Sequence, residues 1–126
     1  MASFLVGTDV LINFLRGDQV ACHLMKENAD SISLSVVIVA EIYAGIRGEK
    51  ETQIVELFFS TIPILEITQP IAQKAGIWVA QFGRSHAVAL PDALIAATAQ
   101  QHDLELKTLN IKHFPMFKGL VPAYRI

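Results

Sequence analysis

The sequence predicts an α/β fold, a twisted parallel sheet of four to five strands with helices on both faces. Short apolar segments, typical of buried strands, alternate along the chain with segments whose apolar residues recur every three or four positions, as in helices. Strands that alternate with helices in this way pair in parallel through right-handed crossovers. With 126 residues the chain has the size of one compact domain, so we expect a single domain over residues 1–126.

Each predicted strand is a short apolar run that polar or turn-forming residues stop. The predicted strands cover residues 3–6, 31–35, 63–67, 104–109 and 119–124. The predicted helices cover residues 10–15, 18–29, 36–48, 50–60, 69–83 and 91–102. Ser35 is expected to cap the third helix, and Pro91 to begin the last one, because its fixed φ suits a first turn. In such a sheet the functional site lies outside the carboxyl ends of the strands, so the strand-to-helix turns are the places to search.

The composition of the chain limits its function. Apolar residues make up 52% of the chain and charged residues 17%, which excludes a disordered protein and points to an apolar surface or an obligate partner. The net charge of -2 at pH 7 gives no overall attraction to nucleic acid. Any contact with nucleic acid must therefore come from a local basic patch.

Cysteine usage and the N-terminal segment predict a cytoplasmic location. The one cysteine, Cys22, supports neither an internal disulfide nor a thiolate zinc site. Asp9 and Asn13 interrupt the first apolar run well short of the roughly 20 residues that a membrane helix needs. We therefore expect no membrane span and no signal peptide.

Three carboxylates stand in apolar surroundings at predicted turns or helices: Asp9 in GTDVLI, Glu41 in VVIVAEIYAG and Asp92 in LPDALIAA. Asp9 alone fits a helix N-cap, and Asp92 alone fits a first turn, where a negative charge favours the helix dipole. Glu41 lies in the middle of a helix, where neither explanation applies. If the three converge, their repulsion requires a cation, and oxygen ligands without a matching Cys or His set favour Mg²⁺ or Mn²⁺. Such a site suits metal-assisted hydrolysis of phosphodiesters.

Polar residues after the fourth predicted strand add to this candidate site. Asn110 is either a turn residue or an oxygen ligand that orients a metal-bound water, and Thr108 would support it. Lys112 is either a surface charge or a contact to an RNA phosphate. His113 is a candidate for substrate contact or proton transfer.

Several segments together carry a resemblance to a known family. FLVGTDVLINFLRGD, SLSVVIVAEIYAGIRG, LPDALIAATAQQHDLELKTLN and KHFPMFKGL follow one another in the family's order, and AEIYAG together with PDALIAA is specific. The chain resembles PIN-domain proteins, in particular the VapC ribonuclease toxins of toxin–antitoxin modules. The resemblance implies a Mg²⁺- or Mn²⁺-dependent endoribonuclease that acts on structured or translating RNA. It also implies a homodimer that a cognate antitoxin holds inactive.

Compared residue by residue, two acids match the family's metal site and one is missing. Glu41 and Asp92 match the second and third acids, and Thr8 matches a Thr of the opening motif. Gly7 stands where the family carries its first metal-binding aspartate. Asp9 falls on a polar position two residues later, so the resemblance implies that it caps the helix and supports the site from behind the metal ligands.

The resemblance also leads to an expectation about metal binding and nuclease activity in this chain. Asn110 stands where many relatives carry a further acid, and Thr8, Thr108, Lys112 and His113 are expected to contact the substrate. Because a glycine supplies neither charge nor oxygen ligand, we expect weak metal binding and little or no nuclease activity. The alternative is a catalytically silent PIN protein that acts by binding an antitoxin.

Overall fold

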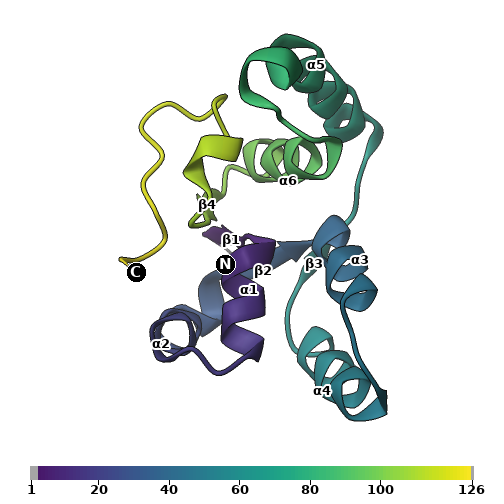
Figure 1. The fold of residues 1–126 in the computed structure, drawn as a ribbon, viewed down its shortest axis with the longest axis vertical. Coiled ribbons are helices and arrows are strands. Elements are labelled where there is room, and N and C mark those ends of the chain that lie inside the picture. Colours follow the sequence, from purple (N-terminus) through teal and green to yellow (C-terminus); the bar gives the residue numbers. More distant parts are fainter. Residues whose placement is uncertain (1–2, 126) are drawn as a thin grey trace.

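A computed structural model describes residues 3–125 of this protein. Its sheet contains four parallel strands (Figure 1). The strands are β1 (Phe4–Val6), β2 (Ile32–Ser35), β3 (Ile64–Leu65) and β4 (Glu105–Lys107). Their order in the sheet is β3-β2-β1-β4. Leu5 of β1 pairs with Ser33 of β2 on one side and with Leu106 of β4 on the other. The parallel sheet with helices on both faces confirms the predicted fold class.

Helices cover both faces of the sheet. They are α1 (Thr8–Leu15), α2 (Gln19–Glu27), α3 (Val36–Ala44), α4 (Glu49–Phe59), α5 (Gln69–His86) and α6 (Leu90–Gln101), with short 3₁₀ turns η1 (Ala29–Ser31) and η2 (Ile111–His113). The α5 and α6 helices lie on one side of the sheet, and α1, α2 and α4 lie on the other (Figure 1). The chain passes from β1 through β2 to β3 and then crosses to β4 on the far side of β1. This reversal of direction between β1 and β4 is where ligands bind in sheets of this kind.

The core lies between the central strands and the inner faces of the helices. Leu5 and Leu34 on the two central strands are fully buried, as is Ile38 on α3. On α6 the buried positions are mainly small: Ala93, Ala96, Ala97 and Ala99. Small side chains allow the α6 backbone to pack closely against α5 and the sheet. The start of α6, which carries Asp92, is therefore held firmly next to the ends of the strands.

Several predicted elements differ from the structure: the third helix ends at Ala44 and not at residue 48, the third strand covers only Ile64–Leu65, and three further elements differ as follows. The fifth strand at residues 119–124 does not form: Gly119 has a φ of +78°, and Ala123 makes one backbone bond, from its N–H to the Thr108 carbonyl. The strand predicted at residues 104–109 covers only Glu105–Lys107. The α5 helix continues past Gly83 to His86, and Ala87 ends it in the left-handed conformation at φ 52°. The last turn of α5 thereby brings Arg84 and His86 into a helix.

None of the helices within residues 3–125 is long and apolar enough to cross a bilayer.

The central position of Leu5 predicts a large effect of truncation. Leu5→Ala should destabilise the protein by about 2–5 kcal/mol, because it opens a cavity between the two helical layers. Leu57→Ala is the matched control, since that side chain is 71% exposed, and it should change the free energy of unfolding by less than about 0.5 kcal/mol. Denaturant unfolding of the three chains measures both values. Similar losses for the two variants would contradict the proposed core.

Candidate active site

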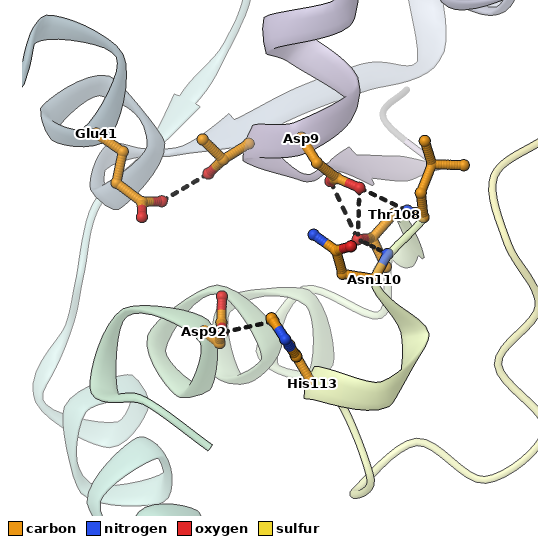
Figure 2. Close-up of polar contacts among 8 residues, drawn as sticks. Asp9, Glu41, Asp92, Thr108, Asn110 and His113 are labelled. Carbon is orange, nitrogen blue, oxygen red and sulfur yellow. Dashed lines mark hydrogen bonds and ion pairs between the residues drawn. The ribbon is translucent and has the colours of Figure 1, made fainter. Parts of the chain in front are cut away.

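A hollow of about 280 Å³ lies at the carboxyl ends of β1 and β4. Its polar lining residues are Gly7, Thr8, Asp9, Glu41, Asp92, Thr108, Asn110 and His113. Figure 2 shows Glu41 on α3, Asp92 on α6 and His113 after β4 facing the space between these elements, whereas the carboxylate of Asp9 on α1 turns toward Thr108. All the predicted site residues except Lys112 meet here, and Lys112 lies on the neighbouring surface.

Glu41 is placed by the cap of α3 and by a contact from α1. The Ser35 hydroxyl accepts a bond from the Val37 N–H at 3.2 Å and fixes where α3 begins, as predicted. Glu41 then lies six residues beyond the cap, and its Oε1 accepts a 2.6 Å hydrogen bond from the Thr8 hydroxyl (Figure 2). A half-buried carboxylate in the middle of a helix is thereby oriented toward the hollow instead of toward solvent.

Asp9 does not cap α1, and this expectation was wrong. Gly7 occupies the N-cap position, and Asp9 lies in the first turn with its side chain turned toward the segment after β4. Its carboxylate accepts hydrogen bonds from the Thr108 hydroxyl at 3.1 and 3.2 Å and from the Leu109 N–H at 2.7 Å. The partners lie about 100 positions further along the chain, so local propensity could not reveal them. The Thr108 hydroxyl also accepts a bond from the Asn110 N–H at 3.1 Å.

Asp92 faces the hollow from the first turn of α6. Its Oδ2 lies 3.4 Å from Nδ1 of His113 (Figure 2). Burial raises the pKa of Asp92 above its ordinary value; the nearby His113 lowers this pKa in part, whereas Glu41 and Asp9 raise it further. The charged form of Asp92 is therefore disfavoured, chiefly because burial removes it from water.

The space beside Gly7 is already filled. A Cβ atom at this position would lie 2.9 Å from Oδ1 of Asp9 and 3.3 Å from both the Lys107 carbonyl oxygen and Cβ of Thr108. Contacts under 3.0 Å force a neighbour to move. A side chain at residue 7 would therefore require the flexible end of the Asp9 side chain to shift.

The donor set fits a hard divalent cation by its chemistry. Glu41, Asp92 and Asn110 offer carboxylate and amide oxygens, and Mg²⁺ binds through one or two carboxylates while it keeps several waters. Within residues 3–125, however, no three or more His, Cys, Asp or Glu side chains are already gathered for a metal ion. Both oxygens of Asp9 are occupied by Thr108 and Leu109. The arrangement is suited to a loosely held, largely hydrated ion.

Sequence reasoning missed the apolar wall of this hollow. Ile12 of α1, Ile95 of α6 and Phe114 line it. Ile12 and Ile95 have the spacing of ordinary core residues on their helices, so no signal in the sequence distinguished them. They exclude water from one side of the acids, which strengthens the electrostatic interactions there.

The family model for the PIN domain matches residues 4–114 of this chain. The chain belongs to the PIN-domain family. This PIN domain is 40% identical over 125 residues to Ribonuclease VapC10 of Mycobacterium tuberculosis, covering 97% of this chain and 93% of the relative. It is 37% identical to Ribonuclease VapC19 of the same organism, covering 95% of this chain and 98% of that one. By family membership it is therefore an enzyme of the VapC ribonuclease group.

Solved structures share the fold of this PIN domain. A toxin–antitoxin complex from Klebsiella pneumoniae contains a chain with a TM-score of 0.84 and 31% identity, covering 98% of this chain and all of that one. DNA-bound VapBC from Salmonella typhimurium gives a TM-score of 0.80 at 22% identity, covering 97% of this chain and 96% of that one. The second likeness speaks for the fold alone.

The Asp9 contacts predict a difference between two substitutions. Asp9→Ala should destabilise the PIN domain by about 1–3 kcal/mol, because the buried Thr108 hydroxyl and the Leu109 N–H lose their acceptor. Asp9→Asn keeps a carbonyl oxygen in place and should cost less than about 1 kcal/mol. Denaturant unfolding in the presence of a chelator compares them. Equal losses would contradict the hydrogen-bonding role of this side chain.

The raised pKa of Asp92 predicts that neutralising this residue stabilises the metal-free fold. The folded state binds the Asp92 proton more tightly than the unfolded state, so ionised Asp92 destabilises the fold at neutral pH. Asp92→Asn should raise the melting temperature by roughly 2–4 °C at pH 7. The gain should shrink as the pH falls toward 3.8, the ordinary value for Asp. Asp30→Asn, at an exposed position on η1, is the control; a gain at Asp92 that does not change with pH would contradict this cause.

Proposed function

We propose that residues 1–126 form one PIN domain that acts as the toxin of a toxin–antitoxin module, an endoribonuclease that uses Mg²⁺ or Mn²⁺ to hydrolyse RNA phosphodiesters. The observation that carries this proposal is the convergence of Glu41 and Asp92 with Asn110 in one hollow at the strand ends. The names of the curated relatives, Ribonuclease VapC10 and Ribonuclease VapC19, support the same class of reaction.

The contacts suggest a separate role for each residue of the site. Glu41, Asp92 and the Asn110 amide oxygen would hold the ion, which when bound polarises the scissile phosphate and favours ionisation of an attacking water. Thr8 keeps Glu41 turned inward through its 2.6 Å bond. His113, 3.4 Å from Asp92, balances part of the negative charge.

The same proposal includes a defect in the chain as it stands. By resemblance, Gly7 replaces the first metal-binding aspartate, and Asp9 turns its carboxylate to Thr108 and Leu109 instead of into the centre. Two carboxylates then remain to hold the ion. We therefore propose that metal binding is weak and that cleavage is slow or absent.

Restoring the missing acid is the direct test of this defect. Gly7→Asp alone would place a side chain 2.9 Å from the Asp9 carboxylate, and two carboxylates about 4 Å apart repel by roughly 4 kcal/mol at an intermediate dielectric. The double variant Gly7→Asp/Asp9→Asn removes this repulsion and keeps the shape of residue 9. We expect Mn²⁺ binding roughly 10–100-fold tighter by calorimetry, and Mn²⁺-dependent cleavage of a mixed RNA substrate about 100-fold faster or more.

Control variants separate the effect of the restored charge at residue 7 from the effect of side-chain volume. Gly7→Asn/Asp9→Asn has the same side-chain volume without the restored charge, and it should resemble the original chain. A chelator should abolish all cleavage. Efficient cleavage by the unmodified chain would contradict the proposed defect, and failure of the double variant to cleave despite bound Mn²⁺ would contradict the nuclease proposal.

An antitoxin partner is the second element of the proposal. Structural neighbours of this chain are toxin–antitoxin complexes from several bacteria. On α4, Ile54 and Leu57 are 51% and 71% exposed one helical turn apart, which suits an apolar partner segment. Phe58 and Phe59 turn partly inward, and Phe58 packs on Phe14 at 5.3 Å. A homodimer stays a prediction.

A binding role without catalysis is the alternative, and Gly7 is the observation that favours it. A catalytically silent PIN protein would retain the fold and its antitoxin while lacking a tight metal site. A cytoplasmic location, expected from the single cysteine Cys22, suits either function.

A further inference from the structure

A second and larger hollow, of about 670 Å³, lies beside the acidic one. Its walls are the last turn of α5, with Arg84, Ser85 and His86, and the segment after β4, with Lys112. The end of α5 and the segment that follows η2 lie next to each other (Figure 1). We call this hollow the basic cleft.

The basic cleft is positive in a protein whose net charge is negative. None of the described residues that line it is acidic, whereas the chain as a whole carries a net charge of -2. Arg84 and Lys112 are both exposed, and neither pairs with a carboxylate within residues 3–125. The C-terminal end of α5 contributes about half a negative charge, which two full positive charges exceed. The cleft therefore offers an anion two unpaired cations.

The floor of the cleft is apolar. Phe114 is 4% exposed, and Phe117 packs edge-on against Trp78 at 5.9 Å, which fixes the position of its ring. A cationic rim above an apolar, aromatic floor matches a single nucleic-acid strand, which presents phosphates on one side and flat bases on the other.

The basic cleft and the acidic hollow are adjacent. Phe114 lines both. Lys112 and His113 are neighbours on η2, yet Lys112 lines the basic cleft, whereas His113 turns toward Asp92 in the acidic hollow (Figure 2). On the opposite wall, α5 ends at His86 and the chain reaches Asp92 within the first turn of α6. A strand that leaves the acids would reach the cleft by crossing the wall that Phe114 shares between the two hollows.

We infer that the basic cleft binds the single-stranded RNA that flanks the scissile phosphate, with Arg84 and Lys112 contacting its backbone phosphates. This inference rests on the proposed ribonuclease function and adds the path of the substrate to it. Arg84 gave no signal in the sequence, because only the extension of α5 beyond Gly83 brings it opposite Lys112.

Binding of RNA without metal tests the cleft independently of catalysis. A fluorescently labelled single-stranded RNA of 12 nucleotides is titrated with the full chain in a chelator at several salt concentrations, and anisotropy gives the affinity. When the logarithm of the affinity is plotted against the logarithm of the salt concentration, two phosphate contacts on a single strand contribute a slope of about -1.4. Arg84→Gln/Lys112→Gln should reduce the steepness of the slope by about this amount and weaken binding about tenfold or more at low salt.

The matched control removes two cations elsewhere. Arg47→Gln/Lys26→Gln changes exposed residues on the α3–α4 connection and on α2, and it should leave the slope unchanged. Both double variants should melt at the same temperature as the original chain, since all four side chains are exposed. An unchanged slope for the cleft variant, an equal loss for the control, or no RNA binding at low salt would each overturn the inference.

The two proposals fail in different ways. If the cleft variant loses RNA affinity but Gly7→Asp/Asp9→Asn never cleaves, the nuclease proposal fails and the cleft is a nucleic-acid site of a silent protein. If the acid-restored chain cleaves but the salt slopes of the cleft and control variants agree, the nuclease proposal holds and the cleft does not bind RNA.

Discussion

The carboxylate of Asp9 is the contact on which the site depends. It joins the first turn of α1 to the segment after β4 by accepting bonds from Thr108 and Leu109. Asn110 and His113 follow directly, and the cleft wall with Lys112 belongs to the same segment. One half-buried, charge-assisted anchor thus helps to set the positions of residues on both hollows, and such bonds are among the stronger ones in proteins.

The site holds its acids at a cost in stability. Burial and the nearby Glu41 and Asp9 all act against ionised Asp92, and His113 offsets them only in part. A fold that gathers carboxylates without a cation is less stable than one with neutral residues there, and such sites are retained when function requires them. Burial is the largest of these causes, so a neutral residue at position 92 would suit the metal-free fold better than ionised Asp92 does.

Much of the fold followed from local patterns, and each failure has a physical cause. The cap at Ser35 and the mid-helix position of Glu41 were visible in the sequence because both depend on neighbouring residues. Asp9 was misassigned as a cap because its partners lie about 100 residues away. Arg84 was overlooked because α5 continues to His86, three residues past the glycine that was expected to stop it, and ends at the left-handed Ala87. Contacts across the fold decided the case of Asp9, and the backbone conformation at Ala87 decided the end of α5.

Residues 7 and 9 form a coupled pair. Since a Cβ at Gly7 would lie 2.9 Å from Oδ1 of Asp9, a side chain at the first position requires the flexible end of the Asp9 side chain to shift. In the family pattern the first acid faces the ion and a polar residue follows two positions later; here the acid stands at the third position and bonds Thr108. By the resemblance, this exchange keeps one carboxylate in the corner and removes an expected ion ligand. The carboxylate that is present bonds Thr108 and Leu109, so the anchor of the segment after β4 does not depend on the proposed loss of the metal ligand.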